Sequence, residues 1–123
     1  MLTTFSKEMV ALKAKLFRGF ADSSRLSILE LLRDGEKTVS ELVSATGLSQ
    51  SNVSNHLACL RACGLVSARP EGRFTLSSLA DDTVRELLAQ AERLLLATGC
   101  GVETCSNYIP EEVPASIEQG GQQ

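Results

Sequence analysis

The segment 38–64 constrains the fold most strongly, because it contains two signals that start helices and a glycine between them. Thr38 followed by Glu41 matches a capping box, which opens a short helix, and Gly47 then breaks the chain. Ser49 is suited to cap a longer helix that extends to the end of the segment. Two helices joined by a tight turn are typical of a helix-turn-helix.

Apolar spacing and turn residues predict the elements on either side of this segment. In chain order they are a helix near 6–20, a helix capped by Asp22, the helix-turn-helix, two β segments near 65–70 and 73–79 joined at Glu71-Gly72, and a last helix from Asp81 to Gly99. This order predicts a mainly α fold with a β-hairpin wing, that is, a winged helix-turn-helix. We expect one domain over residues 1–98 and a partly flexible C-terminal tail over 99–123.

The charge distribution permits DNA binding, although the net charge of the whole chain is −3. Residues 100–123 contain four glutamates and no lysine or arginine, so the rest of the chain is slightly basic. No apolar run is long enough to span a membrane, and the N-terminus lacks a signal-peptide pattern. We therefore expect a cytoplasmic protein.

Short polar side chains at the start of the 49–63 helix are the expected DNA-reading residues. None of them carries a negative charge that would repel phosphate. Two arginines near the hairpin tip could reach the DNA backbone or a minor groove. The predicted DNA-binding set is Gln50, Ser51, Asn52, Ser54, Asn55, His56, Arg69 and Arg73.

All four cysteines lie between residues 59 and 105, and in a reducing compartment such a cluster favours metal binding or redox chemistry over disulfides. Cys59 and Cys63 are four residues apart on a helix, so their thiols share one face and can reach one ion. Cys100 and Cys105 follow the last helix, where a tail could bring further thiolates to the pair. Two small, half-buried hydrophobic residues are the alternative interpretation of the helical pair.

The stretch from Leu48 to Val66, LSQSNVSNHLACLRACGLV, strongly resembles the recognition helix of the ArsR/SmtB family of metal-responsive repressors. The stretch from Ala21 to Leu29 resembles the second helix of that family, and Glu71-Gly72-Arg73 resembles its wing. The resemblance covers roughly residues 8–98. It implies a homodimer that binds double-stranded operator DNA when it is metal-free and leaves the DNA when metal binds.

Within the family, the pair Cys59 and Cys63 resembles the cadmium- and lead-sensing CmtR type. That type implies a third ligand from the C-terminal tail of the other subunit. Cys105 matches the position of this ligand better than Cys100, which has no clear counterpart and could be a fourth ligand, an alternative third ligand or a bystander. Thiolate ligands favour soft ions, so Cd²⁺ or Pb²⁺ is the expected inducer, with Hg²⁺, As(III) and Zn²⁺ as further candidates.

An apolar stripe along the last helix, together with the first helix, is the expected dimer interface, and a monomer core is its alternative interpretation. The stripe consists of Val84, Leu87, Leu88, Ala91, Leu94 and Leu95.

Three other functions remain open at this stage. The same fold could sense thiol oxidation instead of metal. It could be a protein-interaction module. An enzyme that uses a reactive cysteine with His56 is disfavoured, because no third group orients that histidine, and we expect no catalysis.

Overall fold

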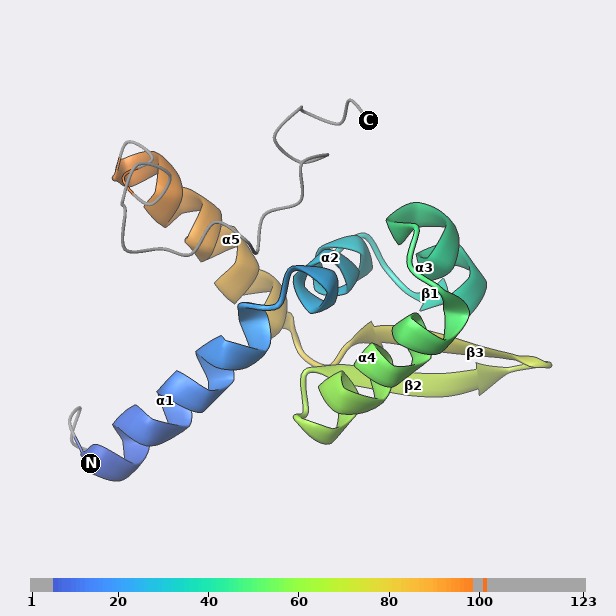
Figure 1. Ribbon diagram of the computed structural model, residues 1–123, viewed down its shortest axis with the longest axis horizontal. Coiled ribbons are helices and arrows are strands. Elements are labelled where there is room, and N and C mark those ends of the chain that lie inside the picture. The colour runs from blue at the N-terminus through green and yellow to red at the C-terminus, as the bar shows by residue number, and fades with distance from the viewer. Residues whose placement is uncertain (1–5, 99–100, 102–123) are drawn as a thin grey trace.

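The computed structural model describes residues 6–98 and 101, which form five helices and three strands within that part of the chain. Two long helices extend away from a body made of the remaining elements, and the β2–β3 hairpin projects from the opposite side of this body (Figure 1). The elements are α1 (Lys7–Phe20), α2 (Ser23–Leu32), β1 (Lys37–Thr38), α3 (Val39–Thr46), α4 (Gln50–Ala62), β2 (Val66–Glu71), β3 (Phe74–Leu79) and α5 (Asp82–Ala97).

The helix starts form where the sequence predicts them, because each has a side-chain cap. Asp22 accepts hydrogen bonds from the backbone at the start of α2, and Ser49 does the same for α4. Thr38 and Glu41 form both halves of a capping box at the start of α3. Gly47 ends α3 at φ +78°, a left-handed conformation that side chains with a Cβ rarely adopt. The helix-turn-helix is therefore confirmed as α3 and α4.

The sheet is antiparallel, with strand order β1-β3-β2. The hairpin of β2 and β3 is the predicted wing, and Glu71 pairs with Phe74 across its tip. The strand β1 is not predicted from the sequence, because a strand of two residues is defined only by its pairing with β3. This strand joins the wing to the start of α3 and so fixes the wing relative to the helix-turn-helix.

The hydrophobic core lies where α2, α3, α4, the sheet and the start of α5 meet. Leu29 of α2, Leu42 of α3 and Leu60 of α4 are almost completely buried. Burying one such side chain contributes about 1.5–3 kcal/mol. The complete buried set is Ile28, Leu29, Leu32, Leu42, Val53, Leu57, Leu60, Val66, Val84 and Leu88.

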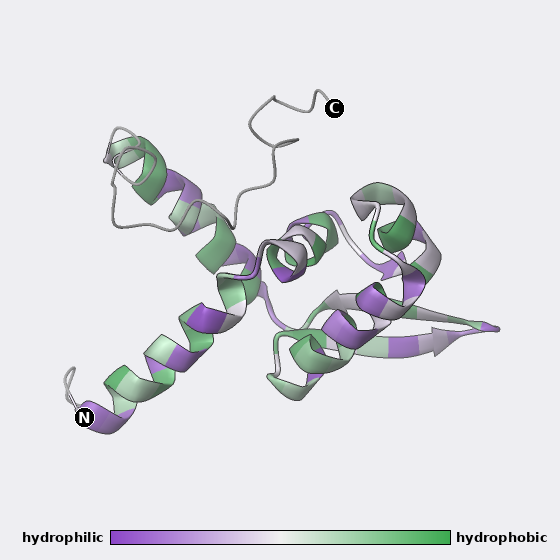
Figure 2. Cartoon of the chain, viewed as in Figure 1, coloured by the Kyte–Doolittle hydropathy of each residue, from purple (hydrophilic) through white to green (hydrophobic). Residues whose placement is uncertain are grey.

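The two projecting helices leave apolar side chains exposed. α1 buries none of its residues, and Leu12 keeps 61% of its surface accessible. On α5, Val84 and Leu88 enter the core, whereas Leu94 is 64% exposed. Figure 2 shows apolar residues along both helices outside the body. The stripe on α5 is thus part of the core at its start and uncovered near its end.

Among residues 6–98 and 101, no helix is long and apolar enough to cross a membrane.

Candidate nucleic-acid interface and metal centre

The helix α4 holds most of the predicted site residues in two groups on its surface. Its core side packs against α2, α3 and the sheet through Val53, Leu57 and Leu60. The predicted DNA-reading residues of α4 are exposed except His56, which is half-buried. The helix N-terminus, with its partial positive charge, lies among these polar side chains. The arrangement suits contact with a phosphate backbone and with base edges.

The two wing arginines differ in the ion-pair partners of their side chains. The guanidinium group of Arg69 donates to Glu36 at 2.7 and 2.9 Å and to Glu71 at 2.6 Å. Hydrogen bonding to Arg69 lowers the pKa of Glu36, and bonding to both carboxylates raises the pKa of Arg69. Arg73 is exposed and forms no side-chain hydrogen bond or ion pair with the described residues. Of the two, Arg73 is therefore the one whose charge is available to DNA.

Cys59 and Cys63 are both exposed, and both are free thiols. Cys63 caps the C-terminus of α4, and its backbone N–H donates to the carbonyl of Cys59 at 3.0 Å. This bond keeps the helical spacing, so the two side chains emerge one turn apart. An exposed thiol pair with this spacing fits a soft metal ion as part of a larger ligand set.

Arg25 of α2 connects Cys59 with the joint between α1 and α2. Its Nη1 atom lies 4.0 Å from the Sγ atom of Cys59 and 3.8 Å from the Oδ2 atom of Asp22. Its Nε atom donates to the carbonyl oxygen of Gly19, near the end of α1, at 3.2 Å. One guanidinium group thus links the thiol, the cap of α2 and the last turn of α1.

The remaining predicted ligands, Cys100 and Cys105, lie outside the described residues, as does nearly all of the predicted tail. Within the part of the chain that the structure describes, no group of three or more His, Cys, Asp or Glu side chains could hold a metal ion. The helical pair therefore needs at least one further ligand to complete a thiolate site.

The roles of Arg25 and Glu36 are not predicted from the sequence. Each forms its contact across more than thirty positions of the chain, with Cys59 and Arg69 respectively. No local spacing signals such a pairing.

Comparison with known proteins agrees with this architecture. Residues 22–68 match the family model described as "Bacterial regulatory protein, arsR family". A "Probable mercury resistance operon repressor" from Streptomyces lividans is 41% identical over 99 residues, covering 80% of this chain and 78% of that protein. The "HTH-type transcriptional regulator CmtR" from Mycobacterium tuberculosis is 43% identical over 97 residues, covering 79% of this chain and 80% of that protein.

Three solved structures share the fold. The crystal structure of Mycobacterium tuberculosis Rv0081 has a TM-score of 0.71 at 39% identity, covering 76% of this chain and 94% of that one. A homodimeric winged helix-turn-helix DNA-binding domain from Mycobacterium bovis has a TM-score of 0.64 at 31% identity, covering 76% and 89%. The NMR structure of the cadmium sensor CmtR from Mycobacterium tuberculosis has a TM-score of 0.55 at 47% identity, covering 63% and 80%. With its capped α3–α4 pair, its wing and these relatives, the chain belongs to the arsR family of bacterial regulatory proteins.

Proposed function

We propose that this protein is a metal-sensing transcriptional repressor that binds operator DNA as a homodimer and releases it when a thiophilic ion binds Cys59 and Cys63. The observation that carries the proposal is that one helix, α4, bears both the exposed polar residues at its N-terminus and the exposed thiol pair at its C-terminus. Any restraint that a metal places on the thiols therefore acts on the DNA-reading helix itself.

The DNA-binding half of the proposal rests on α4 and the wing. Exposed amide and hydroxyl side chains at a helix N-terminus are suited to base edges, and Arg73 adds a cation at the hairpin tip. Homodimers read two half-sites one DNA turn apart, so a small movement of α4 changes the fit of both subunits.

The metal-binding half rests on the chemistry of the ligands. Two thiols, joined by a tail thiolate from Cys105 or Cys100, would form a site selective for soft ions. Cadmium or lead is the proposed inducer, and mercury is the next candidate. Two relatives, a probable mercury resistance operon repressor and a cadmium sensor, are named for ions of the same class.

Arg25 connects the proposed metal site to α1, so metal binding at Cys59 changes a contact outside α4. When an ion takes up the thiolate of Cys59, the guanidinium of Arg25 loses its sulfur partner, while its bond to the carbonyl of Gly19 ties it to α1. To switch an operator from nearly fully occupied to nearly empty, the ion must bind the DNA-free protein more tightly than the DNA-bound protein by about 5.5 kcal/mol. Gathering and deprotonating thiols around a metal supplies energies of this order.

The proposed homodimer rests on the two projecting helices. The exposed apolar faces of α1 and α5 would be covered by a second copy, and a structural relative with the same fold is described as homodimeric. The first and last helices would then form one interface, as the stripe on α5 predicts. The proposed place of action is the cytoplasm, where the thiols stay reduced.

The test uses Cys59→Ser and Cys63→Ser in the full-length protein, with Ala62→Ser as a matched control on the same exposed turn. Operator DNA is titrated with each protein, and cadmium is then added under reducing conditions. We expect all three variants to bind DNA, and only the control to release it with cadmium. Normal release by both cysteine variants would defeat the assignment of the site.

Sensing of trivalent arsenic or of thiol oxidation is the alternative signal, because the exposed thiol pair would serve either. Ultraviolet thiolate-to-cadmium absorption bands under reducing conditions separate metal sensing from oxidation. If those bands are absent and peroxide alone releases the DNA, the signal is oxidation. If arsenite releases the DNA at lower concentration than cadmium, the inducer is arsenic.

A further inference from the structure

Arginine side chains attach both projecting helices to α2. Near the start of α2, the Nε atom of Arg25 donates to the carbonyl oxygen of Gly19, in the last turn of α1, at 3.2 Å. At the end of α2, the Nη1 atom of Arg33 donates to the Oε2 atom of Glu92, on α5, at 2.6 Å. The Nε atom of Arg85, also on α5, donates to the carbonyl oxygen of Arg33 at 3.3 Å. Both long helices leave the body beside α2 (Figure 1), so α2 holds each of them in its direction.

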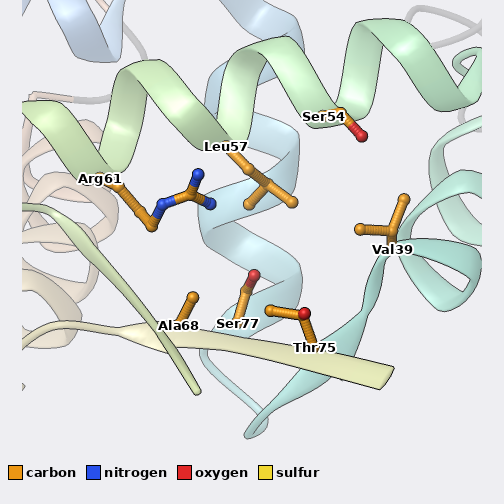
Figure 3. A pocket seen from close by; sticks show the side chains of 7 residues that line it. All are labelled: Val39, Ser54, Leu57, Arg61, Ala68, Thr75 and Ser77. Atoms are coloured by element: carbon orange, nitrogen blue, oxygen red, sulfur yellow. The ribbon is translucent and has the colours of Figure 1, made fainter. Parts of the chain in front are cut away.

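The DNA-reading helix α4 is held on its α2 side and has open space on its sheet side. Ile28, Leu29 and Leu32 of α2 are completely buried in the core that α4 shares. Toward the sheet, a cavity of about 370 Å³ lies beside α4 and is lined by its Leu57 and Arg61 side chains (Figure 3). Densely packed interiors transmit displacements, and an open cavity leaves room for them. The position of α4 therefore follows that of α2.

Glu92 is the outermost point at which α5 is attached to the body. The first half of α5 is anchored in the core by Val84 and Leu88, whereas residues 90–97 are all exposed. Within the part of the chain that the structure describes, the bond to Arg33 is the only side-chain hydrogen bond or ion pair that joins this exposed half to another element. Glu92 lies about 6 Å beyond Leu88 along the helix axis. The bond therefore resists rocking of α5 about its apolar anchor.

We propose that Arg33 is a positioning residue that sets the distance between the two DNA-reading helices of the dimer, and so the separation of the half-sites that the protein selects. This inference rests on the proposed function, in which α1 and α5 form the dimer interface. The outer half of α5 then belongs to the interface, and its bond with Arg33 connects the interface to α2 and through α2 to α4. Half-sites must lie about one DNA turn apart to be read together. Phosphate contacts do not depend on that separation, so the bond serves selectivity more than overall affinity.

The same guanidinium group offers a matched control, because it also binds a carboxylate within α2. The Nη1 atom of Arg33 lies 2.8 Å from the Oε1 atom of Glu30, one helical turn earlier. Glu30→Ala and Glu92→Ala each remove one carboxylate partner of Arg33 and change the net charge equally. Only Glu92→Ala removes the link to α5. Arg33→Ala removes both bonds, and adding Glu92→Ala to it should have no further effect.

The experiment measures binding of the metal-free full-length proteins by fluorescence anisotropy at one salt concentration. The probes are the operator duplex, duplexes in which the half-sites are moved closer or farther apart by one or two base pairs, and a random duplex. Partly exposed ion pairs change an equilibrium constant by about two- to threefold each, and a dimer has two such pairs. Glu92→Ala should therefore lower the preference for the operator over the altered spacings by roughly fivefold. Its affinity for the random duplex and its dimerisation in sedimentation should equal those of the native protein, and Glu30→Ala should keep the native preference.

Three results would overturn the inference while the proposed function stands. The first is a native spacing preference in Glu92→Ala, and the second is an equal loss of preference in Glu30→Ala. The third is an equal loss of affinity of Glu92→Ala for every duplex, which would place the effect in dimer stability or charge. A native protein that binds the operator no better than the random duplex would instead contradict the proposed function, and the inference with it.

Discussion

Removing both carboxylates that hold Arg69 should strengthen DNA binding by the wing. Arg69, Glu36 and Glu71 together carry a charge of −1 at neutral pH, and the double substitution Glu36→Gln/Glu71→Gln converts this to +1. Hydrogen bonding to Arg69 lowers the pKa of Glu36, so this carboxylate is ionised at neutral pH and its removal is a full change of charge. The freed guanidinium, on an exposed strand beside the tip, can then neutralise a phosphate.

The magnitude follows from counterion release. Each additional phosphate contact steepens the dependence of log K on log salt by about 0.9, so the two wings of a dimer add about 1.8. When the salt is lowered from about 200 to about 50 mM, both proteins gain affinity for DNA. The gain of the variant should be roughly ten times the gain of the native protein. Fluorescence anisotropy with a random duplex measures this without knowledge of the operator.

The control for this prediction carries the same change of net charge elsewhere. Glu8→Gln/Glu86→Gln neutralises two exposed carboxylates outside the wing that form no ion pair with the described residues. The reasoning is refuted if the wing variant shows the salt slope of the native protein or only that of the control.

Three further predictions concern coupling, assembly and stability. Arg25→Gln should retain the thiolate-to-cadmium absorption but weaken cadmium-induced release of DNA, because Cys59 loses its link to α1; unchanged release would exclude this link. Leu94→Glu should shift the dimer toward monomer in sedimentation, because this exposed leucine would face the partner; an intact dimer would place the interface elsewhere. Thr38→Ala should lower the free energy of unfolding by about 1 kcal/mol in urea titration, since it removes the capping box, whereas the exposed neighbour Ser40→Ala should cost much less.

The sequence predicts the helix-turn-helix well because its determinants are local. The caps at Asp22, Ser49 and Asp81 each act within three residues, and the structure places a helix start at every one of them. The hairpin is also local, since Gly72 at φ +63° lies between the paired residues at its tip. Family resemblance and these signals together give the fold.

The features that the sequence does not predict depend on contacts between distant residues. The strand β1 is defined only by its pairing with β3. Glu36, which forms an ion pair with Arg69, lies in the loop before β1. The cavity beside Arg61 likewise needs α4 and the sheet to be placed together. Periodicity reveals the apolar stripe on α5, but only the fold shows that the stripe is buried at Val84 and uncovered at Leu94.

X-ray absorption spectroscopy of the cadmium-loaded full-length dimer is the most direct test of the central claim that the DNA-reading helix supplies the metal ligands. The account predicts three or four sulfur ligands per cadmium in the native protein, and a loss of two in Cys59→Ser/Cys63→Ser. An unchanged number of sulfur ligands in that double variant would show that the ion binds elsewhere and would contradict the account.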